Sequence, residues 1–234
     1  MTILLYDLVG SDPSRPFSPH CWKARMALAH KGLAFEALPT RFTEVSDVEG
    51  GGGARGRTVP VIRDGETVVQ DSFAIAEYLD DTYPDRPALF QGQSGRALAR
   101  FVESWTQRTL HPAIVRATIL DIHAAQDDEN KAFFRAKREK AFGNPLEEVQ
   151  DGRTEEKRLA ASKSLEPLRA TLRNQPFLAG ERPMFADYIV FGGFQWLRVL
   201  STFRLFDDGD PIVDWFERCL DLHGGLGRQV PSMA

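Results

Sequence analysis

Two short segments of this chain carry residue types that could do chemistry, and the first is Ser18-Pro19-His20-Cys21. Serine is a favoured N-cap and proline a favoured first residue, so the segment predicts a helix start, where Ser18 would be a simple cap. A helix start also favours a bound anion, because its unpaired N–H groups point outward. Cysteines at both 18 and 21 would make a dithiol redox motif, but Ser18 holds the first position. A hydroxyl forms no disulfide, yet it can donate a hydrogen bond to a thiolate that a ligand carries in.

The second segment pairs Val59-Pro60 with Asp71-Ser72. A proline at the start of a strand marks a sheet edge or a bend, and an edge beside Val59 could pair with an extended peptide. Asp71 and Ser72 are ordinary caps for the helix that follows. They could also hold an amino-acid head group, with Asp71 on the ammonium and Ser72 and the helix N-terminus on the carboxylate. From these residues alone, the capping and edge-proline interpretations stay open beside the binding one.

Other patterns argue against phosphate, metal and disulfide chemistry. The glycine-rich stretch 51–58 resembles a phosphate-binding loop, but Arg57 stands where that loop needs a lysine and a strand follows instead of a helix, so we expect a mobile loop. No histidine spacing fits a zinc site, and we expect no metal. Cys219 is the only other cysteine, so a disulfide framework is excluded, and Cys21 is either reactive or, as we favour, a small residue buried against the sheet. The five cations within Lys131–Lys140 are typical of a solvated helix face.

Elements that can position the first two segments alternate through the first ninety residues. Apolar spacing from Trp22 predicts a helix, and the spacing of Ile75, Leu79 and Tyr83 predicts another that stops at Pro84. An Asp-Gly pair at 64–65 predicts a hairpin between the last two strands. The order fits a mixed four-stranded sheet with helices packed on it. The expected strands are Ile3–Tyr6, Phe35–Leu38, Val59–Ile62 and Thr67–Val69.

Beyond a turn-rich stretch the pattern becomes helical. We expect residues 1–86 to form an α/β domain, 87–95 a linker and 96–234 an all-helical domain. Pro112 should kink or break the first of these helices. Ile189–Leu200 is apolar almost all round and predicts a buried central helix. One apolar face of the first helix is formed by Leu98, Phe101, Val102, Trp105 and Thr109.

Composition limits the partners. The 234 residues include 29 Lys and Arg against 33 Asp and Glu, so the net charge of −4 gives no basic signal for nucleic acid or anionic lipid. No apolar run is long enough to span a bilayer. The two cysteines and the absence of a recognisable signal peptide favour a cytoplasmic protein.

In combination, these motifs resemble the soluble glutathione transferases over the whole N-terminal domain. The matching stretches are Ser18-Pro19 with Trp22, Thr58-Val59-Pro60-Val61, Gln70-Asp71-Ser72 with Ile75, Tyr78 and Leu79, and later Phe185-Ala186-Asp187-Tyr188. The surroundings are similar to bacterial lignin β-etherase-like and fungal etherase-type transferases. The stretches that carry this second likeness are Phe17-Ser18-Pro19, Val59-Pro60-Val61-Ile62, Ala76-Glu77-Tyr78-Leu79-Asp80, Tyr83-Pro84-Asp85-Arg86-Pro87 and Gly224-Gly225-Leu226-Gly227-Arg228.

The resemblance implies a role for each matching residue. Ser18 would stabilise the thiolate of glutathione, and the backbone of Val59 would pair with its cysteinyl part beside a cis-proline at Pro60. Asp71 and Ser72 would hold the γ-glutamyl end. Arg57 would meet the glycyl carboxylate, although a solvated loop cation is the alternative. For the electrophile pocket between the domains, the candidates on the first helix of the second domain are Trp105, Thr109 and Arg116, with a core-facing helix surface as the commoner alternative for such a pattern.

The resemblance also implies a thioredoxin-like N-terminal domain, a helical C-terminal domain and a homodimer. The expected activity is transfer of glutathione to a hydrophobic electrophile, including cleavage of aryl ethers. A carrier of hydrophobic ligands with weak catalysis, or a glutathione-dependent reductase that uses Cys21, are the alternatives. One residue departs from the family pattern: Met184 replaces the Ser or Thr of a capping box with Asp187, so half of that cap should be lost, at a cost of about 1 kcal/mol in folding.

Overall fold

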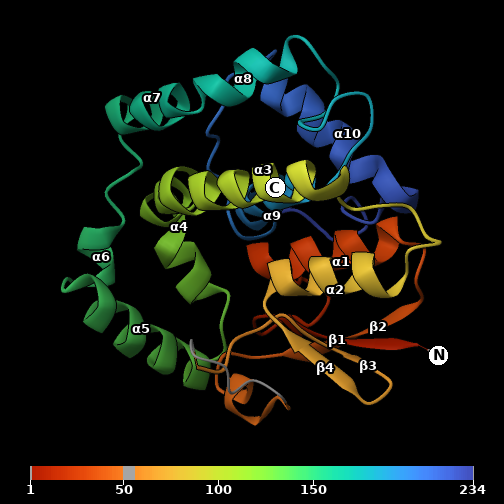
Figure 1. Ribbon diagram of the computed structural model, residues 1–234. Helices are drawn as coiled ribbons and strands as arrows, with labels where there is room; N and C mark the ends of the chain where they lie inside the picture. The colour runs from red at the N-terminus through yellow and green to blue at the C-terminus, as the bar shows by residue number, and fades with distance from the viewer. Residues whose placement is uncertain (1, 50–55, 234) are drawn as a thin grey trace.

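A mixed four-stranded sheet forms the N-terminal domain of the computed structural model, which describes residues 2–49 and 56–233 (Figure 1). The strand order is β2-β1-β3-β4, with β1 parallel to β2 and antiparallel to β3. The hairpin of β3 and β4 turns at Gly65 and Glu66, directly after Asp64, as the Asp-Gly pair predicts. The four strands and their mixed pairing are therefore confirmed, except that the third strand begins at Val61, after Val59 and Pro60, and ends at Asp64 instead of Ile62. The glycine-rich loop lies largely outside the described residues. The strands are β1 Ile3–Leu8, β2 Phe35–Thr40, β3 Val61–Asp64 and β4 Thr67–Gln70.

Two helices cover one face of this sheet, α1 (Pro19–His30) and α2 (Ser72–Thr82) (Figure 1). Their apolar faces are buried, with Trp22 and Met26 on α1 and Ile75 on α2 each fully enclosed. A short 3-10 turn, η1 (Glu44–Asp47), follows β2. Both α1 and α2 begin at the residues that carry the two chemical segments, so the sheet and its helices place Ser18 and Asp71 at the same end of the domain.

A helical domain packs on the opposite side of α1 (Figure 1). Its central helix is buried almost all round, as its composition predicts, and it lies against α1. None of the helices in the described ranges is both long and apolar enough to cross a membrane. The elements are α3 Gly92–Trp105, the π-helical turn η2 Thr106–Leu110, α4 His111–Ala124, α5 Asp128–Phe142, α6 Leu146–Val149, α7 Glu155–Ser164, α8 Glu166–Leu172, α9 Phe185–Leu200 and α10 Pro211–Gly225.

The apolar face expected on the first helix of this domain is only partly buried. Leu98 and Phe101 are 67% and 71% exposed. The helix continues through the π turn η2, in which the His111 N–H donates to the Thr106 carbonyl, five residues back. Such a turn holds an extra residue, so a face drawn at constant helical spacing is out of phase after it. Pro112 stands in the first turn of α4, and the break it predicts is the transition from η2 to α4.

The start of α9 shows what replaces the missing serine or threonine cap. Met184 has no hydroxyl, so the serine or threonine oxygen of the usual box is absent. The Asp187 N–H donates instead to the Met184 carbonyl at 2.9 Å. The other half remains, because the Met184 N–H donates to the Asp187 carboxylate at 3.1 Å. This buried carboxylate also accepts from the Leu178 N–H and from the Trp215 indole, and so it ties the start of α9 to α10.

Candidate functional site

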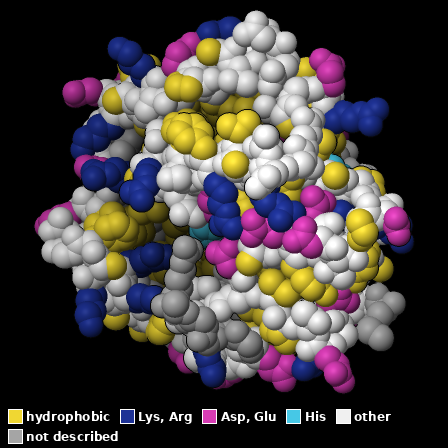
Figure 2. All heavy atoms as spheres, viewed as in Figure 1, with side chains coloured by type: hydrophobic (Ala, Val, Ile, Leu, Met, Phe, Trp, Pro, Cys, Tyr) yellow, Lys and Arg dark blue, Asp and Glu magenta, His cyan; other side chains and the backbone are white. Residues whose placement is uncertain are grey.

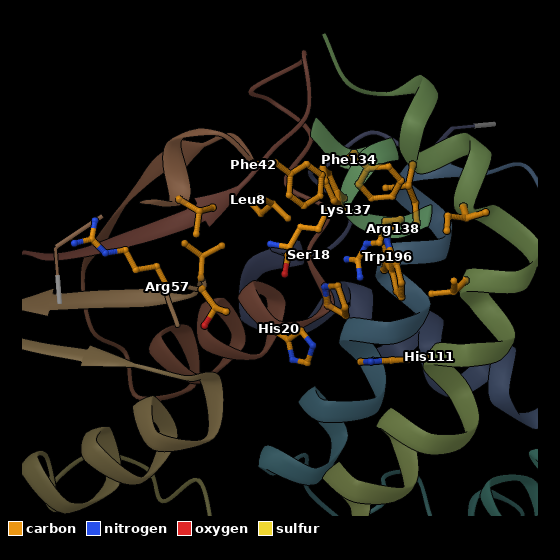
Figure 3. Close-up of a pocket in the computed structure, with 18 of the residues that line it drawn as sticks. Leu8, Ser18, His20, Phe42, Arg57, His111, Phe134, Lys137, Arg138 and Trp196 are labelled. Carbon is orange, nitrogen blue, oxygen red and sulfur yellow. The ribbon is translucent and has the colours of Figure 1, made fainter. Parts of the chain in front are cut away.

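A cavity of about 340 Å³ lies where the start of α1 faces α4, α5 and α9 (Figure 3). Figure 2 shows it as a hollow with a hydrophobic interior, edged by Lys and Arg side chains. Its size is within the range of small-molecule sites. Its apolar walls come from Phe17, Phe42, Val115, Ile119, Ile122 and Phe134. Its polar groups come from Ser18, His20, His111, Lys137, Arg138 and Trp196.

Ser18 caps α1 and also lines the cavity. Its Oγ accepts a hydrogen bond from the Cys21 N–H at 3.3 Å, so the capping interpretation is confirmed. The side chain is only 4% exposed, because it lies at the bottom of the hollow. A hydroxyl that accepts from the helix still has its own proton to donate. The local geometry therefore suits both interpretations of Ser18 at once.

The second segment borders the same cavity. Val59 and Arg57 are among its lining residues, and the peptide between Val59 and Pro60 is cis, as the family resemblance implies. In Figure 3 the guanidinium of Arg57 extends away from Ser18. The Asp71 N–H donates to the Pro60 carbonyl at 3.3 Å, which links this edge to the start of α2.

Asp71 begins α2 with a φ of 82°, a value that few residues other than glycine adopt. One carboxylate oxygen accepts from the N–H groups of Phe73 and Ala74, at 2.9 and 3.1 Å, which confirms the predicted cap. Ser72 is the first residue of the helix and is 3% exposed. The two side chains thus belong to one helix start, with Asp71 toward the surface and Ser72 behind it.

A second, polar hollow of about 750 Å³ opens beside Asp71. Thr58 lines both hollows, so they are neighbours on either side of the segment 58–59. A polar and charged hollow at Asp71 therefore lies next to an apolar cavity at Ser18. The polar hollow is lined chiefly by Gln70, Asp71, Arg100, Glu103, Gln107 and Arg108.

A buried ion pair that the sequence did not indicate lies beneath both hollows. The Lys23 ammonium on α1 is fully buried and donates to both carboxylate oxygens of Glu103 on α3, at 2.8 and 2.9 Å. It also lies 3.2 Å from Nδ1 of His20. Burial lowers the pKa of Lys23, and the charge of Glu103 opposes that shift. The pair fixes the first turn of α1 against the helical domain.

His111 is the second residue of the site that the sequence did not single out. It is 9% exposed and stacks edge-on against both His20 and Trp196. Burial, helped by the charge of Lys23, lowers the pKa of His111 to about 3, so its ring is neutral at ordinary pH. Within the described part of the chain, neither His111 Nε2 nor Trp196 Nε1 has a hydrogen-bond partner, although both atoms are buried.

Comparison with known proteins decides the family. A model of the glutathione S-transferase N-terminal domain matches residues 13–87, and a model of the glutathione S-transferase C-terminal domain matches residues 97–220. The chain belongs to the glutathione S-transferase superfamily. It is 28% identical over 220 residues to the glutathione S-transferase-like protein ustS of Aspergillus flavus, covering 82% of this chain and 78% of that one.

Two solved fungal structures share the whole architecture. The glutathione transferase GSTFuA3 of Phanerochaete chrysosporium has a TM-score of 0.78 at 27% identity, covering 100% of this chain and 99% of that one. The glutathione S-transferase CsGST63524 of Ceriporiopsis subvermispora, solved in complex with glutathione, has a TM-score of 0.76 at 27% identity, covering 93% and 97%. The thioredoxin-like domain followed by a helical domain is therefore the glutathione S-transferase fold.

Cys21 is buried in this member of the superfamily, as we favoured from the sequence. Its side chain is fully enclosed beside Asp7 of β1. Burial raises the pKa of the Cys21 thiol well above its usual range, the charge of Asp7 adds to this, and a hydrogen bond with Ser18 only partly opposes it. A reductase that used Cys21 would need an accessible thiolate, whereas this thiol is protonated and enclosed.

The structure does not bring the three predicted pocket residues of the helical domain to the cavity. Trp105, Thr109 and Arg116 are not among the described residues that line it. Arg116 lies 3.2 Å from Asp151 and borders a separate surface hollow. The π turn η2 explains the position of Arg116, because it shifts the helical phase of α4, which presents His111 to the cavity instead; Trp105 precedes the turn, and its position has no such explanation.

The cationic run Lys131–Lys140 is not wholly a solvated face. Lys137 and Arg138 line the cavity, and Figure 3 shows both beside Phe134. Arg135 follows the expected pattern, since it pairs with Glu139 and Glu147 at 2.8 and 2.9 Å. No metal site accompanies these groups: across residues 2–49 and 56–233, no three His, Cys, Asp or Glu side chains gather to hold an ion.

Proposed function

We propose that this protein is a glutathione transferase in which the Ser18 hydroxyl stabilises the glutathione thiolate while a hydrophobic electrophile occupies the cavity. The observation that carries the proposal is the position of Ser18, at a helix start, on the floor of an apolar cavity. It accepts its hydrogen bond from the helix, so its own proton can be donated to a sulfur atom in the cavity. Glutathione is the co-substrate, and we place the protein in the cytoplasm.

The two neighbouring hollows suit the two ends of glutathione. In this proposal the γ-glutamyl end occupies the polar hollow, with its ammonium at Asp71 and its carboxylate at Ser72 and the start of α2. The backbone of Val59, beside Pro60, pairs with the cysteinyl part, which directs the thiol into the apolar cavity. Arg57 meets the glycyl carboxylate.

A hydrogen bond from Ser18 and the helix N-terminus can together stabilise the thiolate enough for it to form at neutral pH. Lowering the pKa of a thiol by about two units requires roughly 2.7 kcal/mol. A hydrogen bond to a charged group contributes about 1.5–3 kcal/mol, and the helix end about 0.3–1 kcal/mol. The thiol proton goes to solvent, the sulfur then forms a bond to an electrophilic carbon, and the leaving group departs with the electrons of its bond. With an aryl ether the leaving group is the aryloxide.

The similarity to etherase-type transferases around Phe17-Ser18-Pro19 supports aryl ethers as one class of electrophile. The apolar walls of the cavity also suit a carrier of hydrophobic ligands, which is the second candidate function. A carrier would bind such ligands without turnover. We further propose a homodimer, supported by the exposed apolar side chains of Leu98 and Phe101 on α3.

Replacing Ser18 by alanine tests the proposal. We expect Ser18→Ala to raise the pKa of enzyme-bound glutathione by one to two units and to lower kcat/KM with a generic aryl halide by about tenfold to a hundredfold. Ultraviolet absorbance of the bound thiolate against pH gives the pKa, and steady-state assay gives the rate.

Two variants serve as controls. Ser18→Thr keeps a hydroxyl and a helix cap, so it should retain most of the thiolate. Ser14→Ala removes an exposed serine of the same loop, whose hydroxyl donates to Asp12, and should leave both quantities unchanged. An unchanged thiol pKa in Ser18→Ala would exclude Ser18 from thiolate stabilisation. Binding of aryl ligands without turnover would favour the carrier.

A further inference from the structure

We infer that the cavity selects aromatic electrophiles that carry an acidic group, which Lys137 and Arg138 recognise; this inference rests on the proposed function. Both residues lie on α5 and line the cavity that Ser18 also lines. Figure 3 shows their side chains beside Phe134 and Trp196, and Figure 2 shows Lys and Arg side chains around the mouth of the hollow.

The charges of Lys137 and Arg138 are not balanced by the protein. Two of the three other cations of the same helix have acidic partners: Lys131 lies 3.6 Å from Asp128, and Arg135 binds Glu139 and Glu147. Over the described parts of the chain, neither Lys137 nor Arg138 forms an ion pair or a hydrogen bond. Each lies instead over an aromatic ring, 5.4 Å from the centre of Phe133 and of Phe134 respectively.

The charged side chains that line the cavity are also all of one sign. The described residues that form it include Arg57, Lys137 and Arg138 but no aspartate or glutamate. Cations beside apolar walls lose part of their hydration, so a ligand anion placed between them gains attraction without displacing a protein carboxylate. Partial desolvation lowers the pKa of the Arg138 guanidinium, while the residue as a whole remains exposed to solvent.

The chemistry of the two cations suits a carboxylate or a sulfonate. An arginine guanidinium can bind such a group through two parallel hydrogen bonds, and a lysine adds a point charge. The remaining walls, which include Phe17, Phe42 and Phe134, suit the faces of aromatic rings. The buried N–H of Trp196, which lacks a partner, can donate to an oxygen substituent on such a ring.

A chloronitrobenzoate fits this description and gives a balanced reaction. The thiolate of glutathione attacks the ring carbon that bears chlorine, a carbon–sulfur bond forms, and the carbon–chlorine bond breaks with loss of chloride. The carboxylate takes no part in the bond changes, so it reports recognition alone. The matching chloronitrobenzamide has the same ring and leaving group but no charge.

The experiment compares these two substrates, each rate being divided by the uncatalysed rate with glutathione. We expect the ratio of catalysed to uncatalysed rate in the wild-type protein to be larger for the benzoate than for the amide. The double variant Lys137→Gln and Arg138→Gln should raise KM for the benzoate about tenfold or more, and leave KM for the amide and for glutathione within about twofold. Lys140→Gln removes one positive charge from the same helix outside the cavity lining and should change none of these values.

Different results show which of the two proposals fails. A wild-type enzyme that shows no preference for the benzoate, or a double variant that weakens both substrates equally, would overturn the acidic-substrate inference. An increase in the glutathione KM alone would assign the two cations to glutathione instead. If neutral chlorodinitrobenzene is not conjugated either, the proposed function fails. Calorimetry of nitrobenzoate and nitrobenzamide with S-methylglutathione then tests charge recognition without turnover, and equal affinities would overturn it.

Discussion

At the scale of single residues, the caps were predictable and the buried ion pair was not. Ser18 and Asp71 act on N–H groups two or three positions away, so local sequence is enough to predict them. Lys23 and Glu103 meet across 80 residues of sequence, and nothing near either residue indicates the other. The same holds for the free charges of Lys137 and Arg138, because their exposure to a cavity depends on how α5 packs.

His111 predicts a pH dependence of stability. Its folded pKa of about 3 lies below the ordinary value of 6.5 because burial disfavours the charged ring. Between these values the unfolded chain binds the extra proton, so the free energy of unfolding should fall as pH falls from 6.5 toward 3 and then level off. The contribution of this residue is up to several kcal/mol.

Urea denaturation at a series of pH values measures that slope. The variant His111→Asn should show a flatter dependence between pH 6.5 and about 4.5, a window that excludes most carboxylate titration. His123→Asn is the comparison at a less buried site, and it should change the slope less. An unchanged slope in His111→Asn would mean that the ring is protonated in the folded protein.

At the scale of elements, α9 sets the position of the first turn of α1. A Cβ atom built on Gly192 would lie 2.3 Å from the backbone carbonyl oxygen of Pro19, next to Ser18. A Cβ atom on Gly193 would lie 2.8 Å from Cδ2 of Leu110, a side chain that can move. At either position alanine has a helix propensity that is more favourable than that of glycine by about 1 kcal/mol. The two substitutions therefore differ only in the atoms that the new methyl group would contact.

We therefore expect Gly192→Ala to destabilise the protein by about 1–3 kcal/mol and to weaken turnover, because the start of α1 must shift. Gly193→Ala should be closer to wild type in both respects. Chemical denaturation and steady-state assay of the two variants make the comparison. Equal stability of the two variants would show that α1 and α9 can separate without cost.

The sequence located the helices but did not give the rotation of each helix about its axis. Apolar spacing located the helices, and it correctly identified α9 as buried. It assumed constant spacing through residues 98–116, and the π turn η2 breaks that assumption. Because of this turn, α4 presents His111 to the cavity where Arg116 was expected, whereas the exposed Leu98 and Phe101 precede the turn and are not explained by it.

At the scale of the whole molecule, the two domains are joined by polar contacts as well as by apolar packing. His30 on α1 lies 2.7 Å from the Tyr188 hydroxyl on α9, which lies 3.0 Å from His223 near the end of α10. The cavity draws its walls from both domains, so the order of motifs predicts the fold but not the electrophile. That part of the site depends on packing between distant segments.

The exposed apolar residues of α3 lead to a prediction about assembly. Leu98 and Phe101 are one helical turn apart, and the surface along α3 also carries the ion pair of Arg100 with Glu77. Adjacent large apolar side chains on a charged surface are typical of a protein interface, and a two-fold dimer would bury both copies together. We expect Leu98→Asp with Phe101→Asp to convert a dimer into a monomer, since four carboxylates would meet in the interface.

Sedimentation equilibrium measures the mass directly, and far-ultraviolet circular dichroism checks that the variant is folded. Leu159→Asp places the same charge on α7, where Leu159 is 49% exposed, and should leave the dimer intact. Because the polar hollow at Asp71 also borders α3 through Arg100 and Glu103, loss of the dimer should weaken glutathione binding more than electrophile binding. A wild-type protein that sediments as a monomer, or a double variant that remains dimeric, would exclude this face of α3 as the interface.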